Sequence, residues 1–174
     1  SINLSNGLSS YLNQGANVQT GPNGEVYATW TVYIGSSVND GEDGIGFAKS
    51  TDGGVTWSAP IYVYQATNFG IRTTSLPGKG IRCNSFPSMA VDRSGGPNNG
   101  TIYITWAQRG VAPAGSDPDV VFVKSTNGGT NWTTPVRVND DAMSNGKDQI
   151  LPWCTVDQAN GQLLFVFYDS RNVV

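Results

Sequence analysis

The chain has 174 residues with 10 Lys or Arg, 13 Asp or Glu and no His, so its formal net charge is −3. The lack of clustered basic residues argues against a nucleic-acid partner, and the lack of His excludes His-ligated metal sites and Ser-His-Asp triads. No apolar run approaches the ~20 residues that cross a bilayer, so no membrane span is expected.

The chain begins with a stretch that matches the end of a later unit. Residues 2–6, Ile-Asn-Leu-Ser-Asn, line up with residues 136–140, Val-Arg-Val-Asn-Asp. This alignment predicts that residues 1–15 hold the last strand of a preceding unit and a loop. The 22 Gly and 9 Pro favour many short strands joined by turns over helices.

The first complete unit is predicted over residues 16–64. Segments rich in β-branched and aromatic residues give its four strands, at residues 16–20, 25–33, 45–50 and 58–64. The phrase Ser50-Thr51-Asp52-Gly53-Gly54-Val55-Thr56-Trp57 joins the last two. Asp accepts hydrogen bonds from the main-chain N–H groups that follow it, and two adjacent glycines supply φ > 0. The phrase therefore predicts a hairpin turn.

The second unit is predicted over residues 86–138 and repeats this arrangement. Its strands are expected at residues 86–91, 101–108, 119–125 and 133–138. The turn before its last strand reads Ser125-Thr126-Asn127-Gly128-Gly129-Thr130-Asn131-Trp132. Asn127 stands where the first turn has Asp52, which keeps the acceptor and loses the charge. That exchange favours a structural role for the turn over acid catalysis or cation binding.

Residues 151–174 are predicted to be the first half of a third unit. Its strands, at 151–156 and 162–168, correspond to the first two strands of the other units. Along the chain we therefore expect one strand of a preceding unit, two units of four strands each, and two strands of a following unit.

The two turn phrases are similar to the Asp box, or BNR repeat, of sialidase-like β-propellers. The positions that carry the resemblance are Ser50, Asp52, Gly54 and Trp57, and Ser125, Asn127, Gly129 and Trp132. The resemblance implies an all-β fold, a β-propeller of four-stranded antiparallel blades, with about two and a half blades present. Because propellers close with roughly 4–8 blades, we expect part of a ring of about six or seven blades. The parent chain completes that ring or, alternatively, further copies do.

The blade topology sorts the connections onto two faces. The hairpin turns share one face, and the long polar loops share the other, where binding usually resides. Residues of these loops and strand ends are candidate ligand-binding groups: Arg72, Arg82, Arg109, Asp148 and Trp153.

The resemblance also implies what a catalytic set would contain. Sialidases clamp a substrate carboxylate with three arginines, use a Tyr activated by a Glu as nucleophile, and use an Asp as acid/base. The Arg-Ile-Pro phrase of the first clamp arginine is missing, since Ile71-Arg72 and Ile81-Arg82 reverse its order. The best local cluster is Tyr168, Asp169 and Arg171, and its alternative is a salt-bridged loop stem. No complete set is assigned, so enzymatic activity is left open.

Two further groups of residues have candidate roles. Asp40, Glu42 and Asp43 supply oxygens for Ca²⁺ without EF-hand spacing. Asp43 and Asp119 take matching places before a strand, which favours loop anchoring instead. Apart from Ca²⁺, no cofactor is expected. Cys83 and Cys154 form a disulfide bridge, are each buried singly, or pair with chain outside these residues, because spacing does not decide geometry.

Three functions follow from this interpretation. The first is a secreted or cell-surface propeller domain that binds a glycan or another extracellular ligand. The second is a glycoside hydrolase of sialidase type whose catalytic residues lie partly outside these 174 residues. The third is a structural or adhesive module of a large extracellular protein.

Overall fold

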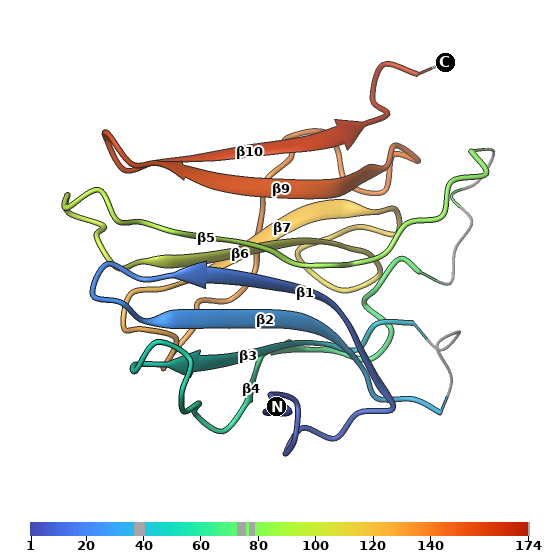
Figure 1. The fold of residues 1–174 in the computed structure, drawn as a ribbon. Helices are drawn as coiled ribbons and strands as arrows, with labels where there is room; N and C mark the ends of the chain where they lie inside the picture. The colour runs from blue at the N-terminus through green and yellow to red at the C-terminus, as the bar shows by residue number, and fades with distance from the viewer. Residues whose placement is uncertain (37–40, 73–75, 77–78, 174) are drawn as a thin grey trace.

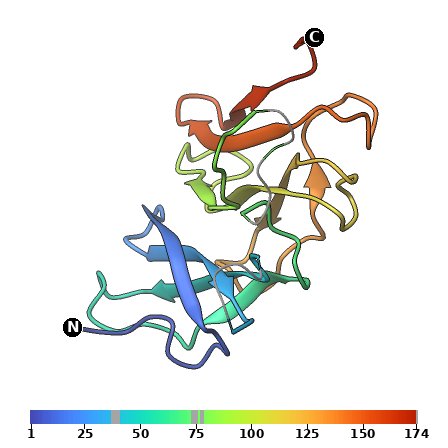
Figure 2. The same ribbon diagram turned by 90° about the vertical axis from the view of Figure 1, so that its right-hand side faces the viewer.

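The chain folds into antiparallel sheets in a computed structural model that describes residues 1–36, 41–72, 76 and 79–173 (Figures 1 and 2). The first sheet has the order β1-β2-β3-β4, with strands at Leu12–Thr20, Val26–Tyr33, Gly44–Ser50 and Ile61–Gln65. The second has the order β5-β6-β7-β8, at Ser88–Val91, Ile102–Gln108, Asp119–Ser125 and Val136–Arg137. The third pairs β9, Gln149–Asp157, with β10, Gln162–Asp169. No helix in the described residues is long and apolar enough to span a membrane.

This architecture confirms the predicted fold class. Two sheets of four antiparallel strands are followed by a pair of strands, as the repeat predicts. The middle strands of the complete sheets are buried on both faces, which explains why β6 and β7 read as nearly continuous apolar runs.

The strand predicted near the N-terminus is not formed. The Oδ1 of Asn3 accepts hydrogen bonds from the N and the Oγ of Ser5, at 3.1 and 2.9 Å, and the N of Leu8 donates to the O of Ser5. These local bonds close turns over residues 4–7 instead of a ladder. Leu4 and Leu8 nevertheless pack on the outer side of the first sheet.

The last strand of the second sheet is shorter than predicted. It was expected over residues 133–138, but β8 contains only Val136 and Arg137. Pro135 has no N–H to donate, so the ladder cannot extend through it.

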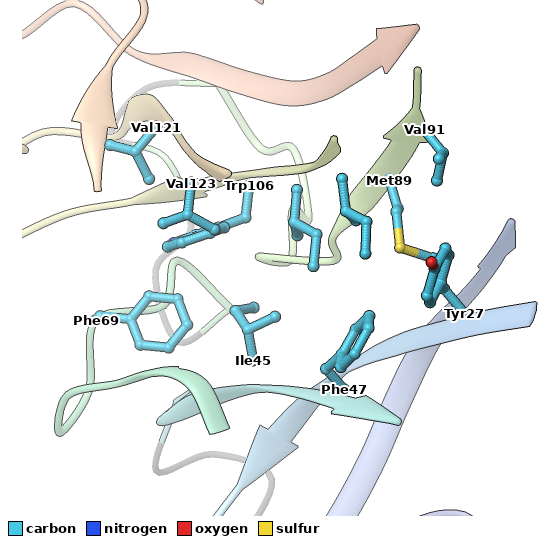
Figure 3. Close-up of a cluster of buried hydrophobic side chains, with 11 residues drawn as sticks. Tyr27, Ile45, Phe47, Phe69, Met89, Val91, Trp106, Val121 and Val123 are labelled. Carbon is cyan, nitrogen blue, oxygen red and sulfur yellow. The ribbon is translucent and has the colours of Figure 1, made fainter. Parts of the chain in front are cut away.

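The main core lies between the first two sheets. Figure 3 shows Tyr27, Ile45 and Phe47 of the first sheet facing Met89 and Trp106 of the second. Phe69, from the segment that joins the sheets, closes the same cluster. Burial of this apolar surface, at about 25 cal/mol per Å², holds the two sheets together.

The third sheet packs on the second with one face and leaves the other open. Cys154 and Val156 of β9 are buried against Ala90 and Tyr103. On the opposite face five large side chains are 44–69% exposed: Leu151, Trp153, Leu164, Val166 and Tyr168.

The connections divide between two ends of the sheets as the topology predicts. Figure 1 shows the short turns β1–β2, β5–β6 and β9–β10 at one end, on the left, and the long connections on the right. The candidate site therefore lies at the end that carries the long connections.

Candidate functional site

The two Trp-terminated turns, Ser50–Trp57 and Ser125–Trp132, share one hydrogen-bond pattern. In the first, the Oγ of Ser50 donates to the Oδ1 of Asp52 at 2.7 Å and accepts from the N of Gly54 at 2.8 Å. The indole Nε1 of Trp57 donates to the O of Gly54 at 3.0 Å. In the second, the corresponding distances between Ser125, Asn127, Gly129 and Trp132 are 3.0, 2.9 and 3.1 Å.

The acidic member of the first turn is engaged by its neighbours. The hydroxyl and the N–H of Thr56 and the hydroxyl of Ser50 all donate to Asp52, and they lower the pKa of this carboxyl to about 2. Asn127 accepts from the N of Asn131 at 2.9 Å in the same place. Both side chains therefore organise their own turns.

A cavity of about 530 Å³ opens among the first strands of the three sheets. Pro87 and Ser88 lie where β5 begins, and Leu151, Pro152 and Trp153 lie early in β9. The full lining is Gln14, Arg82, Asn84, Phe86, Pro87, Ser88, Leu151, Pro152 and Trp153. The cavity thus gathers two of the predicted binding residues, Arg82 and Trp153.

The chemistry of this lining is apolar with a few polar groups. Trp153 is 56% exposed and Phe86 is 38% exposed, so both rings offer surface to a ligand. Arg82 makes no ion pair within the described part of the chain, and no carboxylate lines the cavity. The site therefore combines aromatic faces with one free guanidinium and two amides, those of Gln14 and Asn84.

Arg72, a third predicted binding residue, lies beside this cavity and is held by protein groups. Its guanidinium donates to the side-chain oxygen of Gln14, which lines the cavity, and to the Oη of Tyr33 at 3.1 Å. It also lies 5.3 Å from the centre of the Tyr33 ring. Burial raises the pKa of Tyr33 to about 12, so this phenol stays neutral.

A second cavity, of about 510 Å³, holds other predicted residues. It is lined by Lys79, Ile81, Asp148, Ile150, Leu151, Tyr168, Asp169, Ser170 and Val173. Lys79 pairs with Asp148 at 2.5 Å and donates to the Oγ of Ser170 at 3.0 Å. The phenol of Tyr168 is 69% exposed and makes no hydrogen bond within the described residues.

Asp169 and Arg171 form the ion-paired loop stem that was the alternative to catalysis. The Nε of Arg171 lies 2.5 Å from the Oδ2 of Asp169, and its Nη1 lies 2.6 Å from the Oδ1 of Asp140. Burial raises the pKa of Asp169, but hydrogen bonds from Gln149 and Arg171 outweigh it and the net shift is downward. The catalytic role of Tyr168, Asp169 and Arg171 stays a prediction.

Arg109 lines neither of these cavities, although its surroundings share Asp148 with the second one. It lines a smaller hollow of about 220 Å³ with Asp117 and Asp148. The five predicted binding residues are therefore not one site: Arg82 and Trp153 line one cavity, Arg72 bonds Gln14 of that lining, and Asp148 and Arg109 share the smaller hollow.

The predicted calcium residues act as loop anchors where the structure describes them. The oxygens of Asp43 accept from the N of Ile34 and of Asn68, at 2.8 and 2.9 Å. Asp119 accepts from the N of Gly115 at 2.7 Å, which confirms the anchoring role predicted for this pair. Asp40 lies outside the described residues, and the described part of the chain contains no cluster of three metal-binding side chains.

The two cysteines are both free and buried, so the disulfide alternative is not realised. Cys83 packs with Ile71 and Ile150, whereas Cys154 packs with Val156 in a different cluster. Burial raises the pKa of both thiols, to about 11 for Cys154.

Several cavity residues were missed from the sequence. Nothing in the sequence marked Gln14, Asn84 and Phe86 as cavity residues, because polar and apolar residues of these types occur near strand starts in any blade. The correspondence of Phe86-Pro87-Ser88 with Leu151-Pro152-Trp153 could have identified this position, since the first strands of neighbouring blades come together.

No protein-family model matches the chain, and no curated protein matches it in sequence. Solved structures do match in fold. A Hadza microbial sialidase, Hz136, has a TM-score of 0.60 at 19% identity, over 92% of this chain and 33% of its own. The NanB sialidase of Streptococcus pneumoniae has a TM-score of 0.60 at 12% identity, over 92% and 41%.

The Penicillium chrysogenum alpha-L-arabinanase, solved with arabinobiose, has a TM-score of 0.56 at 18% identity, over 92% of this chain and 42% of its own. These similarities establish the fold, that of propeller glycoside hydrolases. The chain spans only a third to two fifths of the length of these proteins.

Proposed function

We propose that the chain is part of a sialidase-like propeller domain that binds carbohydrate in the cavity of Arg82 and Trp153. The observation that carries this proposal is the lining: an exposed indole, a guanidinium without an ion pair among the described residues, and the amides of Gln14 and Asn84. Aromatic faces pack against the apolar faces of sugar rings, while amides and guanidinium donate to hydroxyl or carboxylate oxygens.

The fold neighbours favour the same class of ligand. Their names include a Trypanosoma rangeli sialidase in complex with sialic acid and an arabinanase complexed with arabinobiose. We infer that the two Trp-terminated turns are Asp boxes, given their matching residues and hydrogen bonds. A secreted or cell-surface location fits a domain that binds such ligands.

Calorimetric titration with sialic acid and with arabinobiose tests the proposal. The chain is expected to bind at least one of these sugars, and Arg82→Ala and Trp153→Ala are each expected to weaken binding roughly tenfold or more. Arg93→Ala is the matched control, since Arg93 is exposed and lines neither large cavity. No binding, or an equal loss in the control, would contradict the proposal.

We also infer that further blades cover the part of the open face of β9 and β10 that carries Leu164 and Val166, which line neither large cavity. The corresponding face of the second sheet, which includes Ala90 and Tyr103, is buried by the third sheet. Native mass spectrometry of the protein from its source tests this. A polypeptide of roughly 40 kDa or more, or a larger assembly of short chains, supports a ring. An isolated chain of 18.5 kDa would exclude it.

A glycoside hydrolase is the second candidate function. The similarity in fold to hydrolases favours this function. The phenol of Tyr168 is exposed and makes no hydrogen bond among the described residues, which argues against Tyr168 as the nucleophile. A fluorogenic sialoside assay separates the two: bound sugar without turnover supports a binding domain, and turnover supports the hydrolase. A structural or adhesive module is the outcome if neither occurs.

A further inference from the structure

The connection between β4 and β5 forms a loop with a narrow neck. One side of the neck is Gly70–Arg72 and the other is Ser85. The N of Ile71 donates to the Oγ of Ser85 at 3.1 Å, and the Oγ1 of Thr31 donates to the O of Ser85 at 3.0 Å.

A single buried carboxylate lies in this neck. Glu42 is 0% exposed, its Oε2 accepts from the N of Arg72 at 3.0 Å, and its Oε1 accepts from the N of Ser85 at 3.0 Å. Its main-chain O also accepts from the N of Gly70 at 3.2 Å. One side chain therefore bonds both sides of the neck.

The neck is fitted closely around this side chain. A Cβ at Gly70 would lie 1.9 Å from the Oε2 of Glu42, so only glycine fits there. The Oη of Tyr33 donates to the Oε1 of Glu42 at 3.2 Å, and the guanidinium of Arg72 lies against the same phenol. A buried carboxylate is costly unless hydrogen bonds and a nearby cation compensate it, and both are present here.

The loop held by this neck builds a wall of both large cavities. Arg82 and Asn84 line the first cavity, and Lys79 and Ile81 line the second. The side chain of Gln14, which lines the first cavity, is joined to the neck through Arg72. Asn84 directly precedes Ser85 of the neck, so the neck adjoins the lining of the first cavity.

We propose that Glu42 is a positioning residue for ligand binding: it fixes the neck and thereby places Arg82 and Asn84 in the cavity. The effect of Glu42 on ligand affinity rests on the proposed carbohydrate function. The effect of Glu42 on the loop is independent of that function. Asp43, the adjacent carboxylate, offers a matched comparison because it bonds Ile34 and Asn68 and not the neck.

The test compares Glu42→Gln with Asp43→Asn by amide hydrogen exchange and by titration with sialic acid and arabinobiose. A Gln amide places an NH₂ group against one of the two N–H donors, so at least one neck bond is lost. Glu42→Gln is expected to speed exchange at Arg72 and Ser85 by roughly tenfold or more and to weaken sugar binding similarly. Asp43→Asn is expected to speed exchange at Asn68 and to leave sugar binding within about twofold.

Two results would overturn the proposal. Unchanged exchange at Arg72 and Ser85 in Glu42→Gln would show that the neck does not depend on this carboxylate. Equal loss of sugar binding in both variants would show a general effect. If wild-type protein binds neither sugar, the proposed function fails while the exchange result still decides the loop. If Glu42→Gln does not fold, Tyr33→Phe, which removes one bond to Glu42, must still speed exchange at Arg72 and Ser85 relative to wild type.

Discussion

The indole ring of Trp132 meets the phenyl ring of Phe47 edge-on across the junction of the first two sheets, with ring centres 5.2 Å apart and planes at 73°. The Nζ of Lys49 donates to the O of Gly128 at 3.1 Å in the same junction. The second Trp-terminated turn thus belongs to one blade and packs on the blade before it.

Gly129→Ala is expected to destabilise this junction more than Gly54→Ala destabilises the first turn. Both glycines have positive φ, +81° and +92°, so both variants carry backbone strain of about 1–2 kcal/mol. Only at Gly129 does the new Cβ meet a neighbour, 2.3 Å from the Phe47 ring, whereas at Gly54 the nearest atom is 3.9 Å away. Urea unfolding should show a further loss of about 1–3 kcal/mol in Gly129→Ala. Equal losses would contradict the packing.

Asp52→Asn is expected to reduce the loss of stability in acid. The folded pKa of Asp52, about 2, is below its ordinary value of 3.8, because Thr56 and Ser50 donate to the carboxylate. The folded state therefore binds fewer protons, and this stability is lost as pH falls from about 4 to about 2. Urea unfolding over that range should be less steep in the variant than in wild type. Asn127→Asp, at the equivalent position, should make it steeper.

The thiols are expected to be unreactive in the folded protein. Cys83 and Cys154 are free and buried, and burial raises the pKa of both thiols. Few thiolates therefore form near neutral pH. A thiol reagent should label two groups per chain only after unfolding. Rapid labelling of the native protein, or two thiols that never react without a reductant, would contradict the described state.

The open face of β9 and β10 predicts tolerance of a charge in the isolated chain. Val166 is 67% exposed, so Val166→Lys should change stability by no more than about 0.5 kcal/mol. Val123 is 0% exposed between the first two sheets, and Val123→Lys should cost about 4 kcal/mol or more. A large loss in Val166→Lys, measured by thermal unfolding in dilute solution, would show that this face is covered.

Much of the fold could be predicted because the residue types in each turn specify that turn locally. Asn-Gly and Gly-Gly pairs mark the hairpins, and the apolar runs between them have the length of strands. The strand predicted near the N-terminus was wrong because Asn3 and Ser5 form a local turn. Such side-chain hydrogen bonds compete with the main-chain bonds of a sheet, and the prediction depended on sequence alignment alone.

The site could be predicted only in part. Arg82 and Trp153 were named separately, but their proximity depends on the path of the loop from Ala66 to Pro87, which no local pattern specifies. Glu42 looked like a solvated loop charge or a calcium ligand. Its buried role became visible only with the N–H groups of Arg72 and Ser85, 30 and 43 residues later in the chain.

That carbohydrate binds beside Trp153 can be tested with the indole N–H signals of the five tryptophans. In a ¹⁵N-labelled sample titrated with sialic acid and arabinobiose, we expect the Trp153 signal to shift in a saturable way with at least one sugar. The signals of Trp30, Trp57, Trp106 and Trp132, which are buried or half-buried, should stay in place. A saturable shift at one of those four with Trp153 unmoved, or no shift at all, would contradict the claim.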